Sequence, residues 1–112
     1  MDTPVEITPA DVSALLARPG QRDFRIIDCR EEDEFHICRL PDAQLVPLSR
    51  FGELAPQAFA DKQENLVIYC HHGMRSLRAA GWLRQQGFLR AQSMSGGIAA
   101  WADVVDPDTP RY

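Results

Sequence analysis

The sequence predicts an α/β domain with a mainly parallel sheet. Segments of strand length alternate with segments of helical periodicity along the chain, and no internal repeat interrupts this order. Four consecutive apolar or aromatic residues at 66–69 are typical of a strand that is buried on both faces. A length of 112 residues with 45% hydrophobic content suits one domain around a single core. We therefore expect one domain over residues 1–112, with a tail over residues 103–112 in which residues 106–110 are poorly ordered.

The composition argues against several classes of function. A net charge of -4 without a basic run does not indicate a nucleic-acid partner. The N-terminal segment, residues 1–11, is acidic and lacks the basic region and apolar segment of a secretory signal or a membrane anchor. No apolar run approaches the length that a membrane-spanning helix needs. We therefore expect a cytoplasmic protein without a membrane or nucleic-acid partner.

The three cysteines, Cys29, Cys38 and Cys70, are an odd number without the regular spacing of a disulfide framework. Reduced thiols in a reducing compartment are the simpler interpretation. The pair of His36 and Cys38 and the run at 70–72 contain residues that bind metals, but neither has the spacing of a structural zinc site. We therefore expect no metal and no cofactor.

Local patterns place the elements of the first third of the chain. Residues 5–7 form a candidate strand, and Thr8 is the expected N-cap of a helix that ends at residues 19–20, Pro-Gly. A second strand is expected over residues 24–28. A short helical segment over residues 31–35 follows it.

The middle of the chain is expected to be structural, without residues of the site. Residues 44–46 form a short third strand, and residues 47–49 open a helix. We expect Pro56 to interrupt this helix, because proline lacks the backbone N–H that an internal position needs. The polar residues 60–65 are expected to form an exposed loop before the central strand.

The last third contains the strongest helical pattern. A helix is expected over residues 76–86, with Ser76 as its N-cap and Gly87 in the left-handed conformation that ends it. Residues 91–94 form the last strand. Trp101 is expected to anchor a final short helix.

Cys70 stands at the end of the apolar strand, and ligands bind at the carboxyl ends of strands in parallel α/β sheets. The loop after it can direct backbone N–H groups to one point, and the following helix adds the positive end of its dipole. Arg75 adds a permanent cation. These effects favour the thiolate, which is the nucleophilic form of cysteine. The residues alone leave two interpretations open, a reactive cysteine in an anion-binding loop and a buried, inert cysteine.

The run at residues 69–76, YCHHGMRS, resembles the active-site loop of the rhodanese family of sulfurtransferases, whose pattern is Cys-x-x-Gly-x-Arg-Ser. Asp28 and Arg30 match the Asp-x-Arg pair of that family, and residues 96–101 are similar to its closing Gly-Gly-x-x-x-Trp segment. The resemblance covers about residues 5–102, the expected core. It implies a three-layer α/β/α fold with a five-stranded, mainly parallel sheet, which the cell-cycle phosphatases share.

The resemblance implies a sulfurtransferase with Cys70 as its catalytic residue. The Cys70 thiolate would take a sulfane sulfur from thiosulfate or a persulfide, hold it as a persulfide, and pass it to a thiol or cyanide. Asp28 and Arg30 are expected to support the site. The residues expected to form the active-site loop and bind substrate are His71, His72, Gly73, Met74, Arg75 and Ser76.

Roles for the loop residues follow from their chemistry. Gly73 is expected to adopt a positive φ. Arg75 either holds an anionic donor or ties the loop together. The hydroxyl of Ser76 is expected to lie near the sulfur. His71 and His72 are either solvated or contact an anionic donor.

Residues 38–43 are Cys-Arg-Leu-Pro-Asp-Ala where the family usually has Gly-His-Ile-Pro-Gly-Ala. Cys38, Arg39 and Asp42 depart from the family pattern, whereas the remaining Leu-Pro-x-Ala still fits it. The variant Ile-Cys-Arg-Leu-Pro resembles rhodanese domains attached to ubiquitin-like-protein activating enzymes, which implies a sulfur-relay protein as a further partner. Cys29 replaces a small aliphatic residue, and we expect it to be inert in the core. Cys38 is either a packed structural cysteine or a resolving thiol.

Three alternatives compete with sulfur transfer. Related phosphatases of the same fold use Cys-x5-Arg, which is one residue longer than the Cys-x4-Arg from Cys70 to Arg75. The shorter loop favours sulfur, because a phosphate needs a wider ring of donors. A non-enzymatic binding module is the second alternative, and a reversibly oxidised redox sensor at Cys70 is the third.

Overall fold

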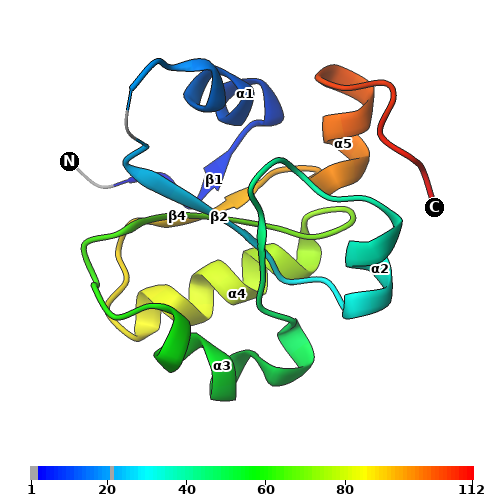
Figure 1. The fold of residues 1–112 in the computed structure, drawn as a ribbon. Coiled ribbons are helices and arrows are strands. Elements are labelled where there is room, and N and C mark those ends of the chain that lie inside the picture. Colours follow the sequence, from blue (N-terminus) through cyan, green and yellow to red (C-terminus); the bar gives the residue numbers. More distant parts are fainter. Residues whose placement is uncertain (1–2, 21) are drawn as a thin grey trace.

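The predicted alternation of strands and helices is present in the computed structural model of the chain, which describes residues 3–20 and 22–112 (Figure 1). The strands are β1 (Glu6–Ile7), β2 (Phe24–Asp28), β3 (Gln44–Leu45), β4 (Asn65–Tyr69) and β5 (Ala91–Met94). The helices are α1 (Pro9–Ala17), α2 (Glu32–Ile37), the 3-10 turn η1 (Leu48–Arg50), α3 (Phe51–Ala58), α4 (Met74–Gln85) and α5 (Gly97–Val104). Residues 1–2, which open the acidic N-terminal segment, lie outside the described residues.

The five strands form one sheet in the order β1-β5-β4-β2-β3, and each neighbouring pair is parallel. The predicted five-stranded α/β fold is therefore confirmed. In the central pair, β2 and β4 run in register from Phe24 opposite Asn65 to Asp28 opposite Tyr69. Both strands consequently end at the same edge of the sheet, where Cys29 follows one and Cys70 follows the other.

Helices cover both faces of the sheet, α3 and α4 on one side and α1 and α5 on the other (Figure 1). The side chains of each strand alternate between the two faces. Ile68 and Cys70 therefore belong to the core beneath α3 and α4, whereas Val67 and Tyr69 belong to the core beneath α1 and α5. This alternation decides which residues can meet at the carboxyl ends of the strands.

Two predicted helix boundaries are confirmed by their hydrogen bonds. The Oγ1 of Thr8 accepts the N–H of Asp11 at 3.1 Å, as expected of an N-cap residue. At the end of α4, Gly87 has φ +101°, and the N–H of Phe88 donates to the carbonyl of Leu83 at 3.0 Å. This is the Schellman arrangement that satisfies the last carbonyl groups of a helix.

The expectation that Pro56 interrupts its helix is wrong. Helix α3 continues through Pro56, and the N–H of Phe59 still donates to the carbonyl of Ala55 at 2.9 Å. Proline removes one N–H donor here, and the carbonyl that loses this partner belongs to Gly52, an exposed residue. Water can satisfy that carbonyl, so the helix tolerates the proline.

The expectation of a poorly ordered tail is also wrong. The chain after α5 lies against the domain, and the hydroxyl of Tyr112 accepts a hydrogen bond from Arg30 at 2.8 Å. The Sγ of Cys38 donates to the carbonyl of Pro110 at 3.3 Å. Tyr112 makes contacts with the domain that the Pro- and Asp-rich composition of this segment does not indicate.

Within residues 3–20 and 22–112, none of the helices combines the length and the apolar character that crossing a bilayer requires. The longest of them, α4, has 12 residues.

We predict that the core beneath α3 and α4 carries much of the stability of the fold. Ile68 is 0% exposed in the central strand β4, so Ile68→Ala should lower the free energy of unfolding by about 2–5 kcal/mol. Ile37 is 48% exposed, so Ile37→Ala should change it by less than about 0.5 kcal/mol. Urea unfolding of both variants measures the difference, and equal losses would contradict this assignment of the core.

Candidate active site

The site is built around the loop that joins β4 to α4. Gly73 has φ +102°, as predicted, and this left-handed conformation turns the chain back over Cys70. Helix α4 begins at Met74 with Gly73 as its N-cap residue, so the expectation that Ser76 caps the helix is wrong. Because the glycine makes the turn by itself, the helix starts earlier, and Ser76 lies in its first turn.

Backbone and side-chain groups of the loop converge on the sulfur of Cys70. The N–H of Gly73 donates to Sγ at 3.1 Å, and the N–H of Ser76 donates to it at 3.3 Å. The hydroxyl oxygen of Ser76 lies 3.5 Å from Sγ, close to the sulfur as predicted. Cys70 is buried, so water does not compete with these groups. The arrangement is suited to hold a negative charge.

The side chain of Cys29 completes the surroundings of Cys70. The Cys29 thiol is the largest influence that lowers the pKa of Cys70, to about 4. The hydroxyl and N–H of Ser76 and the N–H of Gly73 act in the same direction, and burial opposes them. The pKa of the Cys29 thiol is raised by the interaction with Cys70 and by burial. Cys70 is therefore a thiolate at neutral pH, while Cys29 stays protonated.

The hydroxyl of Ser93 hydrogen-bonds to the hydroxyl of Ser76. The hydroxyls of Ser76 and Ser93 lie 2.7 Å apart, and both residues are buried. The hydroxyl of Ser76 is also 3.2 Å from the carbonyl oxygen of Gly73. With Ser93 as a donor to Ser76, the proton of Ser76 is available to the thiolate.

The start of α5 holds the loop from the other side. The N–H of Ile98 donates to the carbonyl of Cys70 at 2.8 Å, and the N–H of Ala99 donates to the carbonyl of His71 at 3.0 Å. These contacts require a glycine at position 97, because a Cβ there would lie 2.4 Å from the carbonyl oxygen of His71. Gly97 also has φ +62°. The Gly-Gly segment thus serves close packing against the loop.

Arg75 ties the loop to helix α2. Its guanidinium group donates to both carboxylate oxygens of Glu34, at 2.7 and 2.9 Å. The same carboxylate accepts the hydroxyl of Tyr112 at 2.7 Å. The Arg75 guanidinium is the main reason that the pKa of Glu34 falls to about 2. Of the two roles considered for Arg75, this geometry corresponds to fixing the loop.

Asp28 and Arg30 are fully buried. The guanidinium of Arg30 donates to the carboxylate of Asp28 at 2.7 Å, and this carboxylate also accepts the hydroxyl of Tyr69 at 2.7 Å. Asp28 lies opposite Tyr69 in the strand register, and Tyr69 belongs to the core on the other face of the sheet from Cys70. The pair therefore positions the end of β4 and contacts Tyr112, without reaching the sulfur.

Three aromatic rings stack beside the loop. The ring of His71 lies 3.9 Å from that of His72 and 4.0 Å from that of Tyr112, measured between centroids. Desolvation and the neighbouring His72 lower the pKa of His71, so this imidazole is neutral at neutral pH. The three rings border a hollow of about 210 Å³. Met74 points outward and is 73% exposed.

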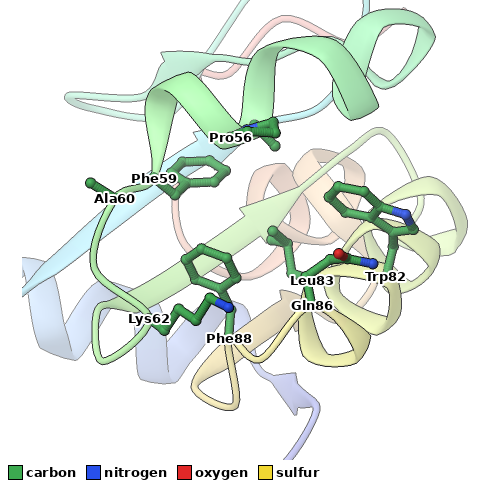
Figure 2. A pocket seen from close by; sticks show the side chains of 9 residues that line it. Pro56, Phe59, Ala60, Lys62, Trp82, Leu83, Gln86 and Phe88 are labelled. Carbon is green, nitrogen blue, oxygen red and sulfur yellow. The ribbon is translucent and has the colours of Figure 1, made fainter.

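Another hollow, of about 260 Å³, lies between α3 and α4 and is apolar (Figure 2). Phe59, Trp82 and Phe88 line it, and the side chain of Lys62 extends along its rim. None of its lining residues belongs to the Cys70 loop. The Cys70 sulfur and this hollow are therefore separate features. In the part of the chain that the structure describes, no three or more His, Cys, Asp or Glu residues are grouped to hold a metal ion.

The structure brings together residues that sequence analysis did not connect with the site. Glu34 is one of several acidic residues in a row, and nothing in that run distinguishes it from its neighbours. Ser93 and Tyr112 stand in no motif. Cys29 was assigned to an inert core, although its place directly after a central strand pointed toward the same sheet edge as Cys70.

A sequence model of the rhodanese-like domain matches residues 8–104 of this chain. A rhodanese-like/PpiC domain-containing protein 12, chloroplastic, of Arabidopsis thaliana is 37% identical over 92 residues, covering 80% of this chain and 31% of the relative. An adenylyltransferase and sulfurtransferase MOCS3-2 of Zea mays is 36% identical over 102 residues, covering 87% of this chain and 21% of the relative. This chain thus spans less than a third of the length of either relative.

Solved structures resemble the fold over nearly the whole chain. A rhodanese-like domain protein from Staphylococcus aureus superposes with a TM-score of 0.78 at 25% identity, covering 96% of this chain and 97% of its own. The human single-domain sulfurtransferase TSTD1 superposes with a TM-score of 0.75 at 21% identity, covering 90% of this chain and 97% of its own. At that identity the second comparison supports the fold alone.

We predict that Gly97 is required for the loop to keep its shape. Gly97→Ala should lower the free energy of unfolding by about 2–6 kcal/mol, because it adds strain at a positive φ and a clash with the loop carbonyls. Gly81→Ala is the matched control, since its Cβ meets nothing within 4 Å. Inside helix α4 this change should stabilise the protein by up to about 1 kcal/mol. Urea unfolding measures both, and a harmless Gly97→Ala would contradict the packing described here.

Proposed function

This chain belongs to the rhodanese-like domain family, and we propose that it is a sulfurtransferase that carries a sulfane sulfur as a persulfide on Cys70. The observation that carries the proposal is the convergence of the Gly73 and Ser76 N–H groups on the Cys70 sulfur. A thiolate that fixed donors already surround needs little reorganisation when a second sulfur is added.

In the first step, the Cys70 thiolate attacks the outer sulfur of a donor such as thiosulfate. A bond forms between the two sulfur atoms, and the bond to the remainder of the donor breaks. Sulfite leaves with the electron pair when thiosulfate is the donor. The pKa of about 4 keeps Cys70 in the attacking form at neutral pH without a separate general base.

In the second step, a thiol or cyanide attacks the outer sulfur of the persulfide and releases the Cys70 thiolate. Until then the outer sulfur is anionic, and the start of α4 offers it backbone N–H groups and the positive end of the helix dipole. The low pKa of Cys70 makes its thiolate a good leaving group. The low pKa of Cys70 thus assists both the attack on the donor and the release of the sulfur.

The hollow of about 210 Å³ beside His71, His72 and Tyr112 is not lined by Cys70, Gly73 or Ser76, so it lies beside the sulfur site and does not enclose it. Because Arg75 is engaged by Glu34, we assign recognition of the donor to the loop N–H groups and the two histidines. A sulfur-relay protein is a further candidate donor or acceptor, since the Zea mays relative is named an adenylyltransferase and sulfurtransferase.

A phosphatase of the related type is less compatible with this site. The loop from Cys70 to Arg75 has four intervening residues, and the guanidinium of Arg75 is held in a two-pronged pair with Glu34. A cysteine-dependent phosphatase needs the arginine of its loop to face the phosphate. The pairing of Arg75 therefore favours sulfur over phosphate as the transferred group.

Intact mass spectrometry after incubation with thiosulfate tests the proposal. One added sulfur atom is expected on the wild-type protein and on Cys38→Ala, the matched control, and none on Cys70→Ser. Subsequent cyanide should remove the sulfur and release it as thiocyanate, because cyanide attacks the outer sulfur of a persulfide.

The proposal fails if neither thiosulfate nor a low-molecular-weight persulfide adds sulfur to the folded wild-type protein. Sulfur on Cys70→Ser would also overturn it, since another residue would then be the carrier. Hydrolysis of an aryl phosphate without sulfur loading would indicate a phosphatase instead.

A further inference from the structure

Cys29 is a fully buried thiol beside the reactive sulfur, and the sulfur transfer proposed above does not consume it. Asp28 and Tyr69 are the last register pair of β2 and β4, and the N–H of Cys29 donates to the carbonyl of Tyr69 at 3.0 Å. Cys29 and Cys70 therefore directly follow the neighbouring strands β2 and β4, and their backbones still lie side by side. Because side chains alternate along a strand, both point to the face beneath α3 and α4.

This placement satisfies the distance requirement for a disulfide. Neighbouring strands lie about 4.8 Å apart, and the Cα atoms of a disulfide are about 4.4–6.8 Å apart. Both side chains also belong to the same buried cluster beneath α3 and α4. The other thiol, Cys38, packs on the opposite face of the sheet with Tyr69 and lies against the carbonyl of Pro110.

We propose that Cys29 is the resolving thiol of a hydroperoxide-reactive pair, which forms a disulfide with Cys70. In the first step, the Cys70 thiolate attacks one oxygen of the peroxide, the O–O bond breaks, and the remainder leaves as water or an alcohol. Cys70 then carries a sulfenic acid. In the second step, the sulfur of Cys29 attacks Cys70, the S–O bond breaks, and the thiol proton leaves with the hydroxyl as water. The two thiols together lose two electrons, which the peroxide accepts.

The arrangement of groups around Cys70 suits both steps. Peroxide reacts with the loop side of the sulfur, where the N–H groups of Gly73 and Ser76 can also hold the oxygen. Cys29 approaches from the β2 side. The largest cause of its raised pKa is the interaction with Cys70, and this cause weakens once Cys70 carries a neutral sulfenic acid. Oxidation of Cys70 thereby makes Cys29 a better nucleophile.

A disulfide between Cys29 and Cys70 would protect Cys70 from further oxidation and would inactivate the site reversibly. A second peroxide converts a sulfenic acid into a sulfinic acid, which ordinary thiols do not reduce. A thiol at the end of the adjacent strand competes with that reaction. The disulfide removes the thiolate that sulfur transfer needs, and a small dithiol restores it. The inference needs only a Cys70 thiolate, so it stands or falls separately from the proposed function.

The test treats the reduced, folded protein with hydrogen peroxide and follows its mass, before and after a dithiol. The wild-type protein and Cys38→Ala should both lose the mass of two hydrogen atoms, and peptide mapping should join Cys29 to Cys70. A dithiol should reverse the change. Cys29→Ala and Cys29→Ser should instead gain oxygen at Cys70 and proceed to the sulfinic acid.

Three outcomes would overturn the inference. The first is a wild-type protein that accumulates sulfinic acid at Cys70 at the same rate as the Cys29 variants. The second is a disulfide that joins Cys38, either within one chain or between two chains. The third is no reaction of the wild-type protein with peroxide. Because the second and third outcomes are observed on the wild-type protein alone, the test does not depend on whether a Cys29 variant folds.

Discussion

The structure depends on one electrostatic constraint, the stabilisation of a buried negative charge on the sulfur of Cys70. A buried thiolate is costly unless donors surround it. The N–H groups of Gly73 and Ser76, the hydroxyl of Ser76 and the thiol of Cys29 provide those donors. Gly73 directs the loop N–H groups inward, and the end of β2 brings Cys29 beneath the sulfur. The local backbone conformation is therefore inseparable from the chemistry.

The loop that provides these donors is held from outside by a chain of charged and polar groups. Arg75 pairs with Glu34, Glu34 accepts the hydroxyl of Tyr112, and Arg30 donates to that same hydroxyl. Arg30 is in turn fixed by Asp28, which the sheet places at the end of β2. This network links the loop to helix α2, the sheet and the end of the chain. It explains how residues that never touch the sulfur can determine the geometry around it.

Sequence analysis predicted the elements whose causes are local. The apolar run of β4, the cap at Thr8 and the glycine stop at Gly87 each depend on neighbouring residues alone. Its predictions were wrong where contacts between distant parts of the chain determine the structure. Pro56 is tolerated because a carbonyl group can turn to water, and Tyr112 is held by partners far away in the sequence.

The same distinction applies to the site. The motif indicated Cys70, Gly73 and Ser76, because their roles follow from the shape of one short loop. Glu34 and Cys29 come from other segments, and only strand register and helix placement bring them to the loop. For Glu34 the sequence carries no pattern from which this placement follows, whereas the position of Cys29 directly after a predicted strand indicated the same sheet edge as Cys70.

The most direct test of this account is a pH titration of the Cys70 thiolate. The ultraviolet absorbance of the thiolate is measured in the wild-type protein and in Cys70→Ser, and the difference isolates Cys70. Because the donors favour the charged form, the pKa is lowered, and the account predicts a midpoint near 4 with the thiolate persisting through neutral pH. A midpoint near 9.0, the ordinary value for a thiol, would contradict the central role assigned to the loop.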